Sequence, residues 1–378
     1  MSSIPDRLDR ARAALEANSA AAILLGLGPD LRYLTGYTAH ALERLTMLVL
    51  PVAGPARLIA PRLEAMAAEA SPAAAQGLVE VLAWGETDDP HALVATILDT
   101  DPVRPGGRVL VNDQLPARDV FRLRELLTEN ELGLAGEVLR ALRIVKAADE
   151  VDLLRRAAQA ADRVVARIAA GSLVGRTEAD VSREVRDLLI EEGHDDASFA
   201  IVASGPNGAS PHHGAGDRRL QPGDPIVLDI GGTVDGYGSD ITRMLWITGP
   251  DEAVPPTPEF LEMFDLVRGA HAAATAAVRP GIRAGDLDEV ARSVIREGGF
   301  GDAFIHRLGH GIGLEAHEDP YLVAGNDETL APGHAFSIEP GIYLHGRFGV
   351  RIEDIVVCGL DGPDVLNEAP RELLVVRG

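Results

Sequence analysis

Two aspartates, Asp229 and Asp240, interrupt the apolar runs of segment 225–248, and carboxylates in such a setting can bind cations. The segment predicts two strands about a turn at Asp235-Gly236, a pair suited to the positive backbone dihedrals of a two-residue hairpin. A carboxylate in an apolar strand is costly to bury unless a cation, a metal or a proton neutralises it. The hairpin is therefore predicted to need positive charge.

The register of this hairpin lets the two acids act together. With the turn in that place, Asp229 pairs with Thr242 and Asp240 pairs with Gly231. The two aspartates are then diagonal neighbours on one face of the ribbon, roughly 7–8 Å apart at their backbones. Both side chains can reach a common point.

A weak internal repeat surrounds the hairpin. The segments that begin at Gly175 and Gly281 align without gaps at an offset of 106 residues, and each predicts a helix closed by a glycine. Five aligned pairs are identical in type, namely Gly175/Gly281, Asp180/Asp286, Arg186/Arg292, Glu191/Glu297 and Gly193/Gly299.

A second acidic strand pair follows the second helix. The run SIEPGIYLHGRFGVRIED predicts two strands about a turn, and a turn centred on Gly346 places Glu339 opposite Glu353. The second half thus repeats the arrangement of the first. A fold with a pseudo-two-fold axis would bring the four carboxylates together.

One imidazole beside four carboxylates would complete a site for two divalent ions about 3.5–4 Å apart. The candidate is His310 in FIHRLGHGIGLEAHE. His306 and His310 have the spacing of a zinc-protease helix, but the glutamate of that motif is missing, and Gly309, Gly311 and Gly313 predict a loop. A phosphate-binding loop is equally poorly supported, because the Lys-Ser/Thr of a P-loop is absent.

Further histidines lie near these motifs in the sequence. His212 and His213 precede the first acidic hairpin, and His317 follows His310 by seven residues. A neutral imidazole near a metal pair can donate to a developing oxyanion or to a leaving group. Ordinary loop packing is the alternative interpretation for each of them. Any one acid alone is also more often a turn or strand-end residue than a ligand, so the matched spacing in the two halves carries the argument.

The elements that must position these residues fall into two domains. Residues 6–18 predict a helix, and the following 120 or so residues alternate strands and helices in a small α/β domain. The predicted strands are 21–28, 46–50, 57–60, 79–84 and 108–113, and the predicted helices are 62–69 and 116–129. A long helix is predicted over 148–170. We place the domains at 1–140 and 141–378.

Composition bounds the class of protein. The chain has 378 residues, of which 46% are hydrophobic and 25% are charged, and no run approaches the about 18 apolar residues of a membrane span. Its formal charge of −23 makes nucleic acid and anionic membranes poor partners. The single cysteine, Cys358, excludes an internal disulfide and a thiolate metal cluster. The start of the sequence does not resemble a secretory signal, so we expect a cytoplasmic protein.

The motifs together resemble a known family. LDIGG-x7-DITR, GHGIGLEAHE, IEPGIY and GVRIED, in this order, resemble the pita-bread metallopeptidases of the creatinase/aminopeptidase superfamily, in the branch of Xaa-Pro dipeptidase (prolidase) and Xaa-Pro aminopeptidase. The resemblance is strong over residues 140–378. The first domain is similar more loosely, through LRYLTGY at 31–37. It implies an α+β fold, with a C-terminal pita-bread catalytic domain of duplicated αβ halves and a smaller creatinase-like N-terminal α/β domain.

The resemblance also implies a site. Its metal ligands would be Asp229, Asp240, His310, Glu339 and Glu353, with Asp240 and Glu353 bridging two divalent ions. Mn²⁺ or Co²⁺ is expected in such an oxygen-rich site, with Zn²⁺ or Fe²⁺ as alternatives.

The same resemblance implies roles for the remaining residues. Glu339 would transfer protons to and from a metal-bridging hydroxide, while His212 and His317 would contact the scissile carbonyl. His306 and Arg351 would line the leaving-group side of the pocket. The expected substrate is a dipeptide or short peptide with an Xaa-Pro bond, and the expected assembly is a homodimer.

Two other functions remain open from the sequence. Relatives on this fold act on small non-peptide substrates as metal-dependent hydrolases or lyases. A non-catalytic binding protein is also conceivable, but that interpretation predicts lost ligands, and all five ligand positions are filled. The sequence does not distinguish dipeptidase from aminopeptidase activity.

Overall fold

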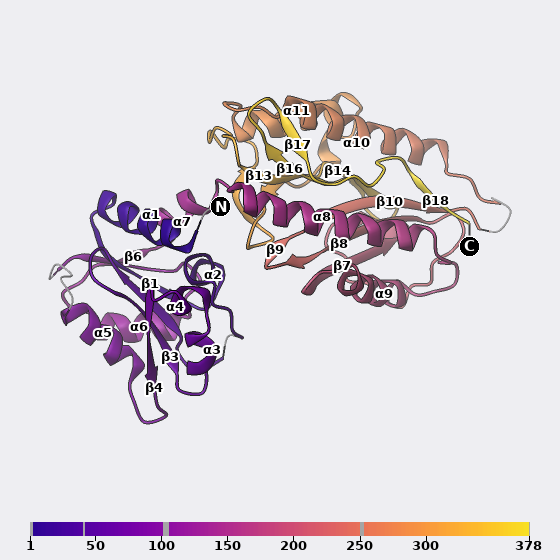
Figure 1. The fold of residues 1–378 in the computed structure, drawn as a ribbon. Helices are drawn as coiled ribbons and strands as arrows, with labels where there is room; N and C mark the ends of the chain where they lie inside the picture. Colours follow the sequence, from indigo (N-terminus) through magenta and orange to yellow (C-terminus); the bar gives the residue numbers. More distant parts are fainter. Residues whose placement is uncertain (1–2, 41, 101–105, 250–252, 378) are drawn as a thin grey trace. The chain divides into compact units, whose positions relative to one another are not determined.

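The structure is a computed structural model that describes residues 3–40, 42–100, 106–249 and 253–377. The chain divides into two compact units, Met1–Arg143 and Ile144–Gly378 (Figure 1). Each unit has its own sheets and its own hydrophobic core. The boundary predicted at residues 140/141 lies within three residues of this division and stays a prediction.

The first unit is a six-stranded mixed sheet with helices around it (Figure 1). The sheet order is β4-β3-β2-β1-β5-β6. The strands are β1 (Ala20–Gly26), β2 (Met47–Pro51), β3 (Ala56–Pro61), β4 (Val79–Trp84), β5 (Arg108–Val111) and β6 (Leu132–Leu134). The helices are α1 (Ile4–Ala17), α2 (Pro29–Thr35), α3 (Ala65–Glu69), α4 (Pro72–Ala75), α5 (Pro90–Thr100), α6 (Ala117–Leu126) and α7 (Gly136–Arg143).

The predicted α/β pattern of this unit is confirmed in outline and incomplete in detail. The first helix and the five predicted strands are present, with ends shifted by a few residues. Helix α3 starts at Ala65 instead of residue 62, because residues 62–64 form a turn after β3. Helices α2, α4, α5 and α7 and strand β6 were not predicted from the sequence. Elements as short as α4 and β6 hold too few residues to display a period.

The second unit consists of two sheets and a ribbon, with helices that cover them (Figure 1). The first sheet has the order β18-β10-β8-β7, with β9 paired to β8, and the second has the order β12-β11-β13-β16-β17; β14 and β15 form the ribbon. The helices are α8 (Ala148–Ala169), α9 (Glu178–Glu191), α10 (Pro258–Ala277) and α11 (Ala284–Glu297), with short 3-10 turns η1 (Gly205–Ala209) and η3 (Gly301–Ala303).

The strands of this unit fall into two groups along the chain. The first group is β7 (Asp196–Ser204), β8 (Pro225–Val234), β9 (Tyr237–Gly238) and β10 (Ile241–Ile247). The second group is β11 (Gly309–Gly311), β12 (Glu318–Leu322), β13 (Ala335–Ile338), β14 (Gly341–Leu344), β15 (Phe348–Arg351), β16 (Asp354–Cys358), β17 (Pro363–Val365) and β18 (Leu374–Val376). Strand β18 belongs to the second group in sequence but joins the first sheet, parallel to β10.

The internal repeat is visible in the two helices. Helices α9 and α11 have the same length, and their ends lie at the predicted offset. Gly193 and Gly299 follow them with backbone φ angles of 110° and 86°, a region that favours glycine. The helix starts differ, because Thr177 forms a capping box with Asp180, whereas Arg283 provides no side-chain cap. The repeat therefore preserves helix position rather than capping chemistry.

The first acidic hairpin has the predicted register. Thr242 pairs with Asp229, and the turn residues Asp235 and Gly236 both have positive φ, at 48° and 79°. Strand alternation fixes which way the acids face. Ile226, Leu228 and Ile230 pack with helices α8 and α9, so Asp229 points to the opposite face, where Val227 and Met244 pack with the second half.

The second acidic hairpin also turns about Gly346 as predicted, but it is interrupted. Strands β14 and β15 pair next to the turn, and β13 and β16 continue the same register further out in a different sheet. Glu339 and Glu353 lie opposite each other at the break between these pairs. The backbone N–H of Glu353 instead donates to Thr242 O at 3.2 Å, which joins this break to the first hairpin.

The predicted loop around His310 is wrong for residues 309–311, which form strand β11. A Cβ at Gly309 would overlap the carbonyl oxygen of Ser337, and one at Gly311 would overlap that of Asp319. These glycines therefore allow close approach of backbones rather than a turn. No helix in the described ranges combines the length and the apolar character needed to cross a membrane.

Candidate active site

The acids of the two halves meet in a buried group. One ligand atom from each of Asp240, His310 and Glu353 lies within 4.8 Å of the others, and all three residues are buried. His310 Nε2 lies 3.6 Å from Asp240 Oδ2 and 3.3 Å from Glu339 Oε1. The two hairpins and strand β11 thus place their functional groups at one point.

The tautomer of His310 leaves a lone pair directed at these acids. Burial and the nearby His317 lower the pKa of His310 to about 3, so the imidazole is neutral. Its Nδ1 lies 3.2 Å from the carbonyl oxygen of Gly311, which can only accept a hydrogen bond. The proton therefore resides on Nδ1, and Nε2 faces carboxylate oxygens with a lone pair, as a metal ligand does.

Two carboxylate oxygens in the group have no hydrogen-bond partner among the described residues. These atoms are Asp229 Oδ1 and Glu353 Oε1, and both are buried. Their companion oxygens are satisfied, since Asp229 Oδ2 accepts from Arg351 and Glu353 Oε2 accepts from Thr242 Oγ1 at 2.8 Å. Buried polar atoms without partners are rare in folded proteins and indicate a missing ligand.

The electrostatics of the group also indicate that it binds a cation. Burial, followed by repulsion from neighbouring carboxylates, raises the pKa of both Asp240 and Glu353 well above its usual value. The pKa of Glu339 rises to about 7, because burial and repulsion from Asp229 outweigh the attraction of Arg351. Four neighbouring carboxylates that are shielded from solvent can all stay ionised only if additional positive charge is bound beside them.

Arg351 ties the group together. Its guanidinium donates to Asp229 Oδ2, to Thr242 Oγ1 at 3.1 Å and to Tyr343 Oη at 2.8 Å. A further bond of 3.3 Å reaches the carbonyl oxygen of Pro211. Arg351 therefore orients the first acid and also fixes the loop that carries the next residue, His212.

His306 extends this chain of contacts. Its Nδ1 lies 2.7 Å from Arg307 O, so Nδ1 carries the proton and Nε2 accepts from the Tyr343 hydroxyl at 2.9 Å. Burial lowers the pKa of His306 to about 4, and the positive charge of Arg351 is the second cause. Burial also raises the pKa of Tyr343 to about 12. Both groups are therefore neutral at pH 7.

The two remaining histidines lie beside the group. The ring of His317 lies 3.9 Å from that of His310. Partial burial of this ring, together with the charges of Arg307 and His212, lowers the pKa of His317. His212 is exposed, and its charge also lowers the pKa of His306. The nine predicted residues are thus gathered around one centre, and their individual roles stay predictions.

A buried glutamate holds the loop that carries His212. The Glu178 side chain is 0% exposed and accepts hydrogen bonds from Ser204 N at 2.8 Å and Ser204 Oγ at 2.6 Å. Asn207 Nδ2 donates to it at 3.0 Å, and His213 Nε2 lies 2.8 Å away. His213 therefore faces Glu178 and anchors the loop.

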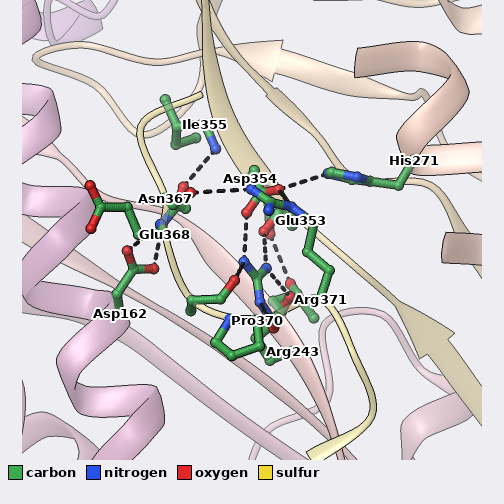
Figure 2. Close-up of polar contacts among 12 residues, drawn as sticks. Asp162, Arg243, His271, Glu353, Asp354, Ile355, Asn367, Glu368, Pro370 and Arg371 are labelled. Carbon is green, nitrogen blue, oxygen red and sulfur yellow. Dashed lines mark hydrogen bonds and ion pairs between the residues drawn. The ribbon is translucent and has the colours of Figure 1, made fainter. Parts of the chain in front are cut away.

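A second buried network of polar contacts holds the backbone at Glu353 and the adjacent Asp354 (Figure 2). Arg243 donates to Asp354 Oδ1 at 2.7 Å and to the carbonyl oxygen of Glu353 at 2.6 Å. Arg371 donates to Asp354 Oδ2, and His271 Nε2 lies 3.1 Å from the same oxygen. Although burial opposes it, the charges of Arg243 and Arg371 and the hydrogen bond with His271 lower the pKa of Asp354 to about 2.

The same network fastens the C-terminal segment (Figure 2). Arg243 donates to the carbonyl oxygens of Ala369 and Pro370, each at 2.8 Å. Asn367 accepts from Ile355 N at 2.8 Å and donates to Asp162 Oδ1 at 3.1 Å. Residues 367–371 therefore connect helix α8 to the strand that follows Glu353.

Two residues of the site, Thr242 and Tyr343, were not predicted from the sequence. Thr242 bridges Arg351 and Glu353, and Tyr343 bridges Arg351 and His306. Both lie inside the motifs DITR and IEPGIY that supported the resemblance. Alternation was the available signal for Thr242, because it is two residues from Asp240 and therefore shares its face.

Comparison with known proteins identifies the family. Residues 152–359 match metallopeptidase family M24, and residues 7–145 match the creatinase/prolidase N-terminal domain. A probable dipeptidase PepE of Mycobacterium tuberculosis is 47% identical over 371 residues, which cover 98% of this chain and 96% of that protein. A Xaa-Pro dipeptidase of Pyrococcus furiosus is 37% identical over 256 residues, which cover 68% of this chain and 72% of the relative.

A solved structure agrees over the full length. The crystal structure of a recombinant prolidase from Thermococcus sibiricus has a TM-score of 0.90 and 34% identity, and the match covers 99% of each chain. The predicted resemblance and the predicted α+β fold, with a pita-bread domain after a creatinase-type domain, are confirmed. The chain belongs to metallopeptidase family M24.

Proposed function

We propose that this metallopeptidase hydrolyses the Xaa-Pro bond of dipeptides or short peptides. The observation that carries the proposal is the buried group of four carboxylates and His310, in which Asp229 Oδ1 and Glu353 Oε1 lack partners among the described residues. The specificity is supported by relatives named Xaa-Pro dipeptidase and prolidase.

The residues of the group fit a pair of divalent ions. Asp229, Asp240, His310, Glu339 and Glu353 would hold them. Carboxylates with one imidazole suit Mn²⁺ or Co²⁺, with Zn²⁺ or Fe²⁺ as alternatives. When bound, such ions supply a Lewis acid and an acidified water for attack on the peptide carbonyl.

The protein residues would transfer protons, stabilise the oxyanion and bind the proline of the substrate. Glu339 accepts the proton of the attacking water and returns it to the leaving nitrogen. His212 and His317 donate to the carbonyl oxygen as it gains negative charge. His306 and Arg351 line the side of the pocket that receives proline, whose imide nitrogen offers no N–H to recognise.

Three wider predictions accompany this function. The catalytic domain comprises residues 141–378 and follows an N-terminal domain of residues 1–140. The protein is a homodimer and works in the cytoplasm. The assembly rests on the family resemblance.

A substrate panel tests the proposal. Purified protein loaded with Mn²⁺ is assayed against Gly-Pro, Ala-Pro, a longer Xaa-Pro-Xaa peptide and Ala-Ala as the control. We expect cleavage before proline and little cleavage of Ala-Ala. Comparison of Ala-Pro with the longer peptide separates dipeptidase from aminopeptidase activity. Metal-loaded protein that leaves every proline peptide intact would disprove the proposal.

A further inference from the structure

Lys146 is the single lysine of the sequence, and every other basic side chain among the 35 lysines and arginines is arginine. It is also buried, with a side chain that is 1% exposed. Lysine is among the residue types least often found fully buried. A chain that uses arginine everywhere else therefore uses lysine at one enclosed position.

The partner of Lys146 lies far away in sequence. Lys146 Nζ is 2.5 Å from Glu318 Oε1, and the Glu318 side chain is 9% exposed. The backbone N–H of Lys146 donates to Gly333 O at 2.8 Å, which fixes the base of the side chain. A buried ion pair is strongly destabilised when one partner is removed, because the other charge stays buried without compensation.

Glu318, the first residue of strand β12, closes the segment 312–318, whose loop presents His317. Glu318 Oε2 accepts from the backbone N–H of Glu315 at 3.4 Å, so the carboxylate holds the loop from inside. A Cβ at Gly313 would lie 2.6 Å from Glu318 Oε1, so this glycine leaves the space that the carboxylate occupies. The loop is built around the Glu318 side chain.

The rest of the loop is attached through its backbone at its start. Ile312 N donates to Ala335 O at 3.1 Å, and Gly313 O accepts from Gly238 N at 2.9 Å. His317 is an exposed side chain at the other end of the loop, beside Glu318. Its ring lies 3.9 Å from that of His310, so its position depends on how the Glu318 end is held.

We propose that Lys146 is a positioning residue that acts through Glu318 to hold His317 against the metal-ligand group. The inference rests on the proposed function, in which His317 contacts the scissile carbonyl. Lysine suits this place because its ammonium is a compact point charge on an unbranched stem, whereas the guanidinium of arginine is a wider planar fork. Charge alone is therefore not sufficient at this position.

Four single variants separate the possibilities. K146M removes the charge and keeps the length, K146R keeps the charge and changes its shape, and E318Q removes the charge of the partner. The matched control is R155M, which removes the cation of an ion pair made by helix α8, between Arg155 and Asp364 at 2.6 Å. The Arg155 and Asp364 side chains are 33% and 44% exposed.

Hydrogen exchange with mass spectrometry tests whether Lys146 and Glu318 restrain residues 312–318, and it needs no assay of activity. K146M and E318Q are expected to exchange faster than wild type in peptides that cover 312–318, with unchanged exchange over 225–248. R155M is expected to match wild type in both regions. Unchanged exchange over 312–318 in both K146M and E318Q would overturn the inference.

Kinetics test whether Lys146 acts through His317. K146M is expected to lower kcat by about 10- to 100-fold, as loss of a supporting contact behind a metal-site group does. K146R is expected to recover only part of it. In the H317A background, K146M should cause no further loss, because the residue it positions is gone. Equal losses in both backgrounds would show a merely structural role and overturn the proposal.

The experiments distinguish failure of the proposed function from failure of the positioning role of Lys146. If wild-type protein cleaves no Xaa-Pro peptide, the proposed function is wrong, and the exchange of 312–318 still decides whether Lys146 holds the loop. If wild type is active and K146M keeps full kcat, the positioning role is wrong and the proposed function stands.

Discussion

Asp229 Oδ1 and Glu353 Oε1 are the atoms that most directly indicate what the site binds. A buried polar atom that lacks a partner costs about 1–3 kcal/mol, and more when it is charged. Their companion oxygens are well bonded, so the side chains are held with these two atoms directed into the group. A divalent cation would satisfy both oxygens and would compensate the repulsion among the acids.

The Asp240→Asn variant tests this at the level of one residue. The amide keeps the shape of the side chain but loses the negative charge of a proposed metal ligand. We expect activity on Ala-Pro to be abolished and one of the two bound ions to be lost, as measured by metal analysis after gel filtration. The control is Asp265→Asn, at an exposed residue of helix α10. Turnover near the wild-type level in D240N would refute the assignment.

At the residue scale, the sequence predicted the acids and His310 because their types and spacing repeat between the two halves. It did not predict the roles of Thr242 and Tyr343. Their hydroxyls join Arg351 to Glu353 and to His306, and the contact between Thr242 and Arg351 links residues more than 100 positions apart. A threonine or tyrosine in a strand also gives no functional signal in the sequence when the residues that its hydroxyl contacts are unknown.

Helices α9 and α11 show how the elements support the site. Each helix packs behind the strands of its own half. The first turn of α9 also supplies Glu178, whose carboxylate holds the loop of His212. Burial alone would raise the pKa of Glu178, but the hydrogen bonds from Ser204, His213 and Asn207 outweigh it and lower the pKa below its usual 4.5.

This shift predicts how stability depends on pH. A carboxylate whose pKa is lowered by folding stabilises the protein fully above its unfolded pKa, and the contribution is lost as pH falls through the folded pKa. E178Q should therefore be less stable than wild type at pH 7, by about 1.5–3 kcal/mol for charge-assisted hydrogen bonds. The difference should shrink below pH 4.5, where wild type loses its advantage.

Urea unfolding at pH 7 and at pH 3 measures this difference. The control is E191Q, at an exposed position of the same helix, which should stay within about 0.5 kcal/mol of wild type at pH 7. A gap between E178Q and wild type that is the same at both pH values would contradict the role of the ionised Glu178.

The Arg243 network predicts a larger loss of stability (Figure 2). The Arg243 and Asp354 side chains are 1% and 0% exposed, so R243M leaves a buried carboxylate and several carbonyl oxygens with fewer donors. We expect the free energy of unfolding to fall by about 3–5 kcal/mol.

The control for R243M is R156M, since Arg156 and Asp235 form an exposed pair at 3.6 Å. Loss of such a pair should cost at most about 1 kcal/mol. Urea unfolding of both variants at pH 7 makes the comparison. Equal stability of R243M and R156M would show that the network does not hold the C-terminal segment.

Elements were predictable where a pattern was long or repeated. The helices at 178–191 and 284–297 followed from apolar spacing and closing glycines, and the hairpin register followed from Asp235-Gly236. Strand β11 was mistaken for a loop, because glycines that allow close backbone approach look the same in sequence as glycines that make turns.

At the scale of the whole chain, the catalytic unit is held together by a core that both halves share. Val227, Met244 and Trp246 of the first sheet pack with apolar residues of α10, α11 and the second group of strands. The site lies on the same face as this core. The repeat in the sequence anticipated this pairing of halves, but the return of β18 to the first sheet was not foreseen, since no local signal marks a partner about 130 residues away.

The proposed function requires that the acids of both halves bind divalent ions. Metal-free protein, prepared with a chelator, is titrated with Mn²⁺ while bound metal and cleavage of Ala-Pro are measured on the same samples. We predict that two ions bind per chain, that activity rises with their occupancy, and that E353Q binds fewer ions and stays inactive. Full activity in the metal-free protein, or in E353Q, would contradict the account.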